Sequence, residues 1–183
     1  TPILLLSAAL PDEYREIARH GFIPTISSLK EALLYAKNAP RRAPIHFKVD
    51  TGMGRLGALI DEAEDTLQAI ARLSLTIQSI STHLSSADSD RATTLKQLKE
   101  FERLLPLLRA HAPEAKVHVL NSAATMLYPD RSGDLVRAGL ALYGISPIPR
   151  FQKLLRPALA WKASVTFIHD LPKGHLISYG GTY

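Results

Sequence analysis

The sequence predicts an α/β protein with a parallel sheet, followed by a shorter β-rich segment. Short apolar runs alternate with helical patterns about six times within residues 1–150, which is typical of parallel strands joined by right-handed helical crossovers. After Pro157 the apolar residues recur at every second position instead, which favours a half-buried antiparallel strand. The chain has 183 residues, of which 46% are hydrophobic, so it can form one large domain or two small ones.

The expected elements follow one another in a regular order. Apolar runs predict strands at 3–6, 24–26, 45–50, 75–82, 117–120 and 135–140. Helical spacing predicts helices at 11–20, 61–72, 92–111 and 123–127. Another helix is expected to begin at Ser28, because Glu31 three residues later completes a capping-box pattern. The residues expected to share one face of that helix are Leu29, Ala32, Leu33 and Ala36.

Two architectures fit this order, a doubly wound sheet and a (β/α)8 barrel. The expected strands are two fewer than a barrel needs, so a barrel would have its first strands before Thr1. Prolines cluster at 147, 149 and 157, where the periodicity changes. We therefore expect a partial barrel at 1–150 and the start of a β-rich second domain at 151–183, with strands at 159–168 and 176–179.

The composition excludes several classes of protein. Without cysteine the chain forms no disulfide, thiolate metal site or cysteine nucleophile, and this agrees with a cytoplasmic location. No apolar run approaches the roughly 18 residues of a membrane helix. The formal net charge of +5 comes from dispersed cations, which indicates either a solvated surface or attraction of an anionic ligand.

Polar side chains alternate with apolar ones in the strand expected at 45–50. One face would carry Ile45, Phe47 and Val49, and the other His46, Lys48 and Asp50. Buried polar groups are costly unless they pair or serve a site. Glycines at 52 and 54 allow a tight turn at the carboxyl end of the strand, where such folds place their sites, and Arg55 would lie there. The alternative is an ordinary turn with a buried Lys–Asp pair.

Four other segments place candidate functional residues near strand ends. His83 follows one strand, and Ser122 offers a hydroxyl near free backbone N–H groups, which suits a phosphate. Arg137 lies in an apolar run, so it needs a partner or a ligand, and Gly139 lets a ligand approach the backbone. Tyr179 precedes a glycine turn. The alternatives are a structural histidine, a plain helix cap, a buried Arg–carboxylate pair and a packing tyrosine.

These segments resemble the alanine racemase family, whose members use pyridoxal 5'-phosphate. The matching blocks, in order and at similar spacing, are Lys48–Gly57, Thr82–His83, Asn121–Ala124, Val136–Leu140 and Ser178–Tyr183. The family has an N-terminal (β/α)8 barrel followed by a mostly β domain. The resemblance therefore implies a TIM-type barrel that lacks its first strands, followed by the start of the second domain.

The resemblance also implies roles for the cofactor-binding residues. Ser122, Gly139 and Leu140 would hold the cofactor phosphate through a hydroxyl and backbone N–H groups. Arg137 would face the pyridine nitrogen, and His83 would bond to that arginine. No metal ion is expected in the site.

Three further residues match the reaction centre of the family. Arg55 would lie beside the substrate carboxylate and the phenolic oxygen of the cofactor, and Lys48 matches a lysine that is often carbamylated and then bonds to that arginine. Tyr179 matches the catalytic tyrosine, which reaches the site from a partner subunit and so implies a homodimer. The implied activity is interconversion of L- and D-alanine by proton transfer between two bases, supplying D-alanine for peptidoglycan in the cytoplasm.

One block of the family pattern has no counterpart. The Schiff-base lysine of the family lies on the first barrel strand, in a motif like Val-Lys-Ala-Asn-Ala-Tyr-Gly-His, and residues 1–183 contain no such segment. We therefore expect a central fragment of a racemase that is inactive alone. The alternatives are a serine or broad-specificity amino-acid racemase, a non-enzymatic pyridoxal-phosphate carrier, and a catalytically empty interaction domain.

Overall fold

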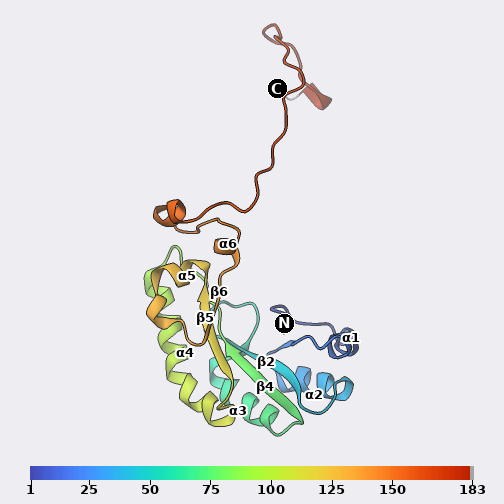
Figure 1. The fold of residues 1–183 in the computed structure, drawn as a ribbon, viewed down its shortest axis with the longest axis vertical. Helices are drawn as coiled ribbons and strands as arrows, with labels where there is room; N and C mark the ends of the chain where they lie inside the picture. Colours follow the sequence, from blue (N-terminus) through green and yellow to red (C-terminus); the bar gives the residue numbers. More distant parts are fainter. Residues whose placement is uncertain (182–183) are drawn as a thin grey trace.

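A computed structural model describes residues 1–181 as a parallel sheet with helices along it and an extended C-terminal segment (Figure 1). Thr182 and Tyr183, the end of the last family-like block, lie outside the described residues. The strands are β1 Thr25–Ile26, β2 Ala43–Asp50, β3 Ala58–Leu59, β4 Leu75–Ser81, β5 Lys116–Asn121 and β6 Leu135–Arg137. The α-helices are α1 Tyr14–Arg19, α2 Leu29–Asn38, α3 Ile60–Ala71, α4 Arg91–His111, α5 Ser122–Leu127 and α6 Gly139–Leu142. Short 3₁₀ helices cover Pro129–Arg131, Pro149–Leu154 and Tyr179–Gly181.

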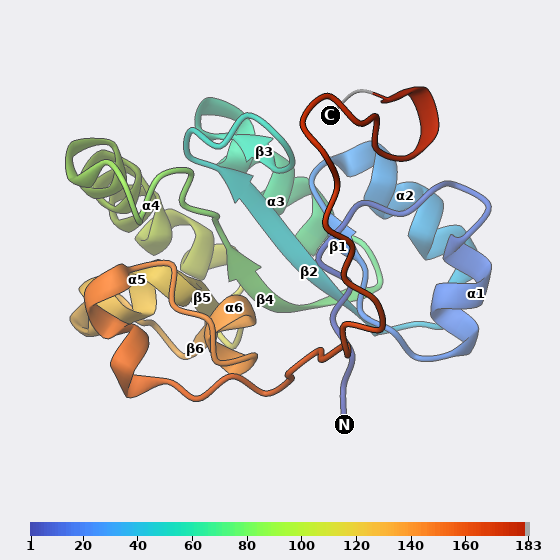
Figure 2. The same ribbon diagram turned by 90° about the horizontal axis from the view of Figure 1, so that it is seen from above.

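All strand pairs of the sheet are parallel, in the order β1-β2-β4-β5-β6, with β3 beside the end of β2. The first apolar run joins the same edge, because Leu4 forms a parallel bridge with Ile23 just before β1. Helices α2, α3 and α4 lie along one side of the sheet, which curves away from them (Figures 1 and 2). A doubly wound sheet carries helices on both faces, so this arrangement favours the barrel.

The alternation expected in 45–50 is confirmed by the different surroundings of the two faces of β2, although every residue there is buried. Ile45, Phe47 and Val49 have no exposed surface and belong to the hydrophobic core with residues of α3 and α4. The opposite face carries His46, Lys48 and Asp50, which are also buried. The sheet is therefore covered on its apolar face by helices and presents buried polar groups on its other face.

The capping signal at Ser28 is confirmed, but the expected face of α2 is partly wrong. Ser28 Oγ accepts a hydrogen bond from Glu31 N at 3.3 Å, and the Glu31 carboxylate accepts one from Ser27 N at 2.6 Å. The buried residues of α2 are Ala32 and Tyr35, whereas Leu29 and Leu33 are exposed. The buried stripe is therefore rotated toward Tyr35, whose ring packs against Tyr14 of α1 with centroids 5.6 Å apart.

The strand expected at 135–140 is shorter in the structure. Strand β6 ends at Arg137, and Gly139 already begins α6. Strand β6 pairs with residues 118–121 of β5, and its last residue, Arg137, lies opposite Asn121, the last residue of β5. The change of direction brings the start of α6 to the carboxyl ends of the strands.

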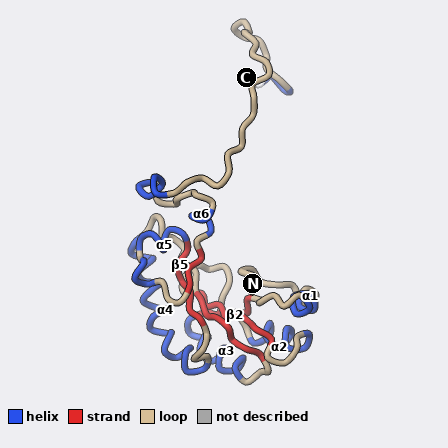
Figure 3. The backbone as a smooth tube through the Cα atoms, in the orientation of Figure 1, coloured by secondary structure: helices blue, strands red, loops and turns tan. Residues whose placement is uncertain are grey.

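The strands expected at 159–168 and 176–179 are not formed in the structure. Residues 155–178 contain no helix or strand and run away from the sheet (Figure 3). Trp161 is 92% exposed, and its alternating apolar neighbours are exposed as well. A strand requires hydrogen bonds from a neighbouring strand, and no part of residues 1–181 pairs with this segment. The division into domains at residue 150 stays a prediction.

Candidate functional site

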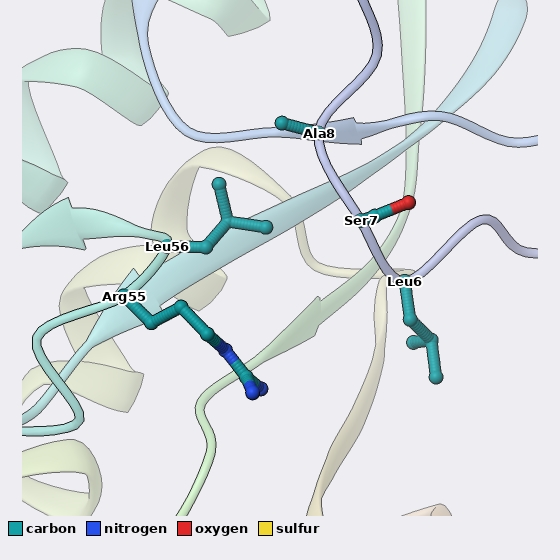
Figure 4. Close-up of a pocket in the computed structure, with 5 residues that line it drawn as sticks. All are labelled: Leu6, Ser7, Ala8, Arg55 and Leu56. Carbon is teal, nitrogen blue, oxygen red and sulfur yellow. The ribbon is translucent and has the colours of Figure 1, made fainter. Parts of the chain in front are cut away.

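Two neighbouring cavities lie at the carboxyl ends of the parallel strands. One has a volume of about 430 Å³ and contains all five residues predicted to bind the cofactor: His83, Ser122, Arg137, Gly139 and Leu140. The other has a volume of about 560 Å³ and is lined by Arg55, Leu56 and residues 6–8 (Figure 4). Leu6 lines both cavities. The tertiary structure thus brings the predicted residues of four segments to one edge of the sheet.

The loop after β2 is held by a single carboxylate. The two oxygens of Asp50 accept hydrogen bonds of 2.7–3.2 Å from four consecutive backbone N–H groups, those of Gly52, Met53, Gly54 and Arg55. Burial raises the pKa of Asp50, but the four N–H donors outweigh it and the net shift is downward. At Gly57, with φ of 138°, a Cβ atom would lie 2.4 Å from Asp50 N, so the loop returns closely onto the strand. This geometry directs Arg55 into the larger cavity (Figure 4).

Lys48 is a buried cation among other cations. It is 5% exposed, and its pKa is lowered to about 8 by burial first and then by repulsion from Arg137 and Arg55, while Asp50 opposes the shift. No ion pair joins Lys48 to Asp50 within residues 1–181, so the alternative of a simple buried Lys–Asp pair is wrong. A larger fraction of neutral amine therefore exists at this lysine than at an ordinary one.

Arg137 is held by neutral acceptors. Its Nη1 donates to His118 Nδ1 at 2.6 Å and to the His118 carbonyl at 2.8 Å, and its Nη2 donates to the carbonyls of Thr82 and Val119 at 2.8 and 3.0 Å. Nη2 also lies 3.3 Å from His83 Nδ1, so the predicted contact of this pair is present. No carboxylate pairs with Arg137 in the described chain, so the Arg–carboxylate alternative is wrong. Its positive charge is uncompensated, and Nε–H has no partner among residues 1–181.

Two histidines on the polar face of the sheet support this arginine. His118 of β5 is 2% exposed and stacks on His46 of β2, with ring centroids 4.8 Å apart. Both ring nitrogens of His46 bond to hydroxyls, Nδ1 to Ser79 and Nε2 to Ser81. Burial, then Arg137 and Lys48, lowers the pKa of His118 to about 4. His118 was not among the predicted site residues, although its place between Val117 and Val119 on an alternating strand was a usable signal.

Ser122 and Gly139 begin the two short helices beside the smaller cavity. Asn121, rather than Ser122, caps α5, because its side chain accepts a hydrogen bond from Ala124 N at 3.0 Å. Ser122 Oγ accepts one from Ala141 N of α6 at 3.2 Å. Of the alternative helix cap by Ser or Asn, the asparagine cap is therefore confirmed and the serine cap is wrong. A Cβ atom on Gly139 would meet no atom within 4 Å, because the glycine faces open space. The site therefore offers a hydroxyl and unobstructed backbone at the start of α6.

Tyr179 is not brought to these residues. It lies in the C-terminal segment, which runs away from the sheet (Figure 1), it lines neither cavity, and its side chain is 100% exposed. Within residues 1–181 no group of three His, Asp or Glu side chains is placed to hold a metal ion. The structure also contains no helix, among the residues it describes, with the length and apolarity needed to cross a membrane.

The charge balance of the site identifies the kind of ligand it fits. Lys48, Arg55 and Arg137 face the strand ends, while Asp50 is engaged by its own loop. Excess positive charge in a partly buried site favours a bound anion. The hydroxyl of Ser122 and the backbone N–H groups beside Gly139 are hydrogen-bond donors of the kind that bind phosphate oxygens. The fold and site thus define a parallel β/α protein with a positively charged cavity at the carboxyl ends of its strands.

Comparison with known proteins identifies the family. Residues 1–147 match the model of the alanine racemase N-terminal domain, and the chain belongs to this family. It is 40% identical over 185 residues to an alanine racemase of Methylacidiphilum infernorum, covering 99% of this chain and 47% of that protein. Structurally, it is similar to the alanine racemase of Clostridium difficile 630, with a TM-score of 0.86, 31% identity, and coverage of 100% of this chain and 50% of that one.

One related structure contains a cofactor. This chain is similar to the alanine racemase of Bartonella henselae with covalently bound pyridoxal phosphate, with a TM-score of 0.63 and 31% identity. The match covers 80% of this chain and 43% of the Bartonella chain. The chain spans about half the length of the curated relatives that it matches. The family assignment confirms the expected fold class, a parallel β/α barrel fold of which these residues form a part.

Proposed function

We propose that residues 1–183 form the cofactor-binding half of an alanine racemase, an isomerase that interconverts L- and D-alanine with pyridoxal 5'-phosphate. The observation that carries the proposal is the uncompensated guanidinium of Arg137, held by five neutral contacts at the edge of a cavity that Ser122 and Gly139 also line. The names of the relatives and the pyridoxal phosphate of one related structure support the same activity.

The residues of the smaller cavity fit the two ends of this cofactor. The Ser122 hydroxyl and the backbone around Gly139 and Leu140 would hold the phosphate. The Nε–H of Arg137 would donate to the pyridine nitrogen. Burial lowers the pKa of Arg137 only to about 10, so at neutral pH the arginine donates a hydrogen bond and keeps its proton. The chemistry that the bound cofactor supplies is delocalisation of the negative charge left at Cα.

Arg55 and Lys48 would serve the substrate side of the site. The guanidinium of Arg55 projects into the larger cavity, where it would bind the substrate carboxylate. The lowered pKa of Lys48 leaves more neutral amine to react with carbon dioxide, and the resulting carbamate would carry a negative charge toward Arg55. Carbamylation would thus convert a repulsive Lys48–Arg55 pair into an attractive one.

Tyr179 would act as one of the two bases from a second copy of the protein. Its full exposure and its place in a segment that leaves the sheet support a role in the site of another copy of the protein, not in the site of its own chain. Racemisation removes the Cα proton on one face and returns a proton on the other, so the enzyme requires bases on both faces. We accordingly propose a homodimer in the cytoplasm that supplies D-alanine for peptidoglycan.

The proposal is tested by replacing Arg137 with methionine in the complete racemase. We expect the dissociation constant for pyridoxal 5'-phosphate, measured by cofactor absorbance, to rise more than about tenfold, because a charge-assisted donor is lost. The matched control is Arg72→Met, an exposed arginine after α3, which should bind normally. Racemisation of a panel of L-amino acids then defines the substrate. Unchanged cofactor binding by Arg137→Met would contradict the proposal.

A further inference from the structure

The N-terminal third of helix α4 contains a buried amide that the proposed reaction does not use. Gln97 is 2% exposed, and the buried residues that follow it on α4 are apolar: Leu98, Phe101, Leu104 and Leu108. An amide removed from water is costly unless its hydrogen bonds are replaced. Gln97 does not line either cavity at the strand ends. Its contacts therefore indicate what it stabilises.

All the hydrogen-bonding capacity of the Gln97 amide is used. Its Oε1 accepts from Ser85 N at 2.9 Å and from Ser85 Oγ at 3.0 Å. Its Nε2 donates to the His83 carbonyl at 3.2 Å and to Thr51 Oγ1 at 3.4 Å. A backbone N–H only donates and a carbonyl only accepts, so these partners fix which end of the amide faces each loop.

The two loops joined by Gln97 carry the residues of the site. Thr51 follows β2 and begins the loop that ends at Arg55, and its hydroxyl also lies 2.7 Å from that of Thr82 at the end of β4. Next in that loop is Gly52, where a Cβ atom would lie 3.6 Å from Gln97 Cγ, so the loop packs directly on this side chain. Gln97 thus contacts the Arg55 loop by packing and by a hydrogen bond.

On the other loop, Gln97 acts on the backbone of the residue that bonds to Arg137. The imidazole of His83 lies 3.3 Å from Arg137 Nη2, while its carbonyl accepts the hydrogen bond from Gln97. Ser85, which donates both of the hydrogen bonds that Gln97 Oε1 accepts, itself lines the smaller cavity. One rigid helix therefore fixes the position of both site loops through one side chain.

We propose that Gln97 is a positioning residue that sets the spacing between the Arg55 loop and the His83–Arg137 pair. It acts through Thr51 and His83 and does not touch the ligand. The inference rests on the proposed function, because it assumes that both loops bind one cofactor–substrate complex. Loss of the amide would leave each loop folded on its own strand and would weaken the connection between the two loops to the hydroxyl contact of Thr51 with Thr82.

The test compares two substitutions in the complete racemase. Gln97→Met keeps the length of the side chain and removes its four hydrogen bonds, whereas Gln97→Glu keeps the acceptor for Ser85 and loses the donors to Thr51 and His83. We expect both variants to raise the dissociation constant for pyridoxal 5'-phosphate and the KM for L-alanine by about tenfold. The carbonyl of His83 would face a carboxylate oxygen in Gln97→Glu, so this variant should show the larger change.

Leu104→Ala is the matched control, because it removes buried atoms from the same helix without touching either loop. It should lower the Tm at least as much as Gln97→Met while leaving cofactor affinity and KM within about twofold of wild type. A merely structural role for Gln97 would give the same pattern as this control, and that result would overturn the inference. If Gln97→Met binds normally while Arg137→Met does not, only the positioning role fails. Normal binding by both variants would refute the proposed function itself.

Discussion

Replacing His118 with asparagine is expected to make the folded protein less sensitive to acid. The Nδ1 atom of His118 accepts a 2.6 Å hydrogen bond from Arg137, so this nitrogen must stay unprotonated in the folded state. The ring is 2% exposed and stacks on His46. A proton on His118 would face the guanidinium donor and add a cation near Lys48. Asparagine removes the titrating group and can keep an acceptor near the position of Nδ1.

The size of the effect follows from the two pKa values. Burial, then Arg137 and Lys48, lowers the pKa of His118 from 6.5 to about 4. Between these pH values the unfolded chain binds a proton that the folded chain does not, so folding stability falls as the pH falls through this window. At pH 4 the loss from this one group amounts to about 3 kcal/mol. Above pH 6.5 neither state is protonated, and the loss disappears.

Urea unfolding at pH values from 7.5 to 4, followed by far-ultraviolet circular dichroism, measures this difference. The wild type should lose about 3 kcal/mol more stability across the range than His118→Asn. A constant difference at all pH values would reflect only the cavity left by the smaller side chain. The control is His169→Asn, at an exposed position in the C-terminal segment, for which we expect the wild-type pH dependence. Parallel curves for wild type and His118→Asn would refute the reasoning.

Four shorter predictions follow from the same site. Asp50→Asn should destabilise the protein by about 2–4 kcal/mol in chemical denaturation and raise the KM for alanine, because two of four backbone hydrogen bonds are lost; an unchanged midpoint would contradict this. Lys48→Met should abolish the carbamate carbonyl signal seen by nuclear magnetic resonance after incubation with labelled bicarbonate, and a persisting signal would exclude Lys48 as its source. Gly139→Val should weaken cofactor binding more than about tenfold at an unchanged Tm, because the new side chain occupies open cavity; normal binding would show that the cavity is not used. Residues 1–183 alone should not racemise alanine in a coupled oxidase assay, and measurable turnover would refute the fragment interpretation.

Sequence patterns predicted most of the parallel part of the fold, because the longer strands and helices there have their own local signals, whereas β3 and α6 were not predicted. The alternation in 45–50 predicted which side chains of β2 face the helices, and Ser28 with Glu31 predicted the start of α2. The pattern failed where the signal depends on a neighbour. The residues after Pro157 alternate as a strand does, yet without a paired strand they form none.

In the candidate site, the sequence predicted which residues take part better than it predicted their hydrogen-bond partners. Spacing and strand position singled out Arg137, but two of its contacts are carbonyls of Thr82 and Val119, which any sequence supplies. A backbone carbonyl that accepts a hydrogen bond cannot be recognised from the pattern of side chains in the sequence. His118 and Gln97 were missed for the related reason that a single polar residue between apolar neighbours in the sequence is ambiguous until its partners are known.

The amino-acid sequence by itself determined the order of strands and helices, the family-like blocks, and the set of charged residues that follow the strands. Only the tertiary structure decided that Arg137 carries an uncompensated charge, that Asp50 binds its own loop, and that Lys48 has a lowered pKa. The physical reason is that secondary structure follows from local periodicity. Charge compensation and desolvation, in contrast, depend on atoms brought together from segments up to 55 residues apart.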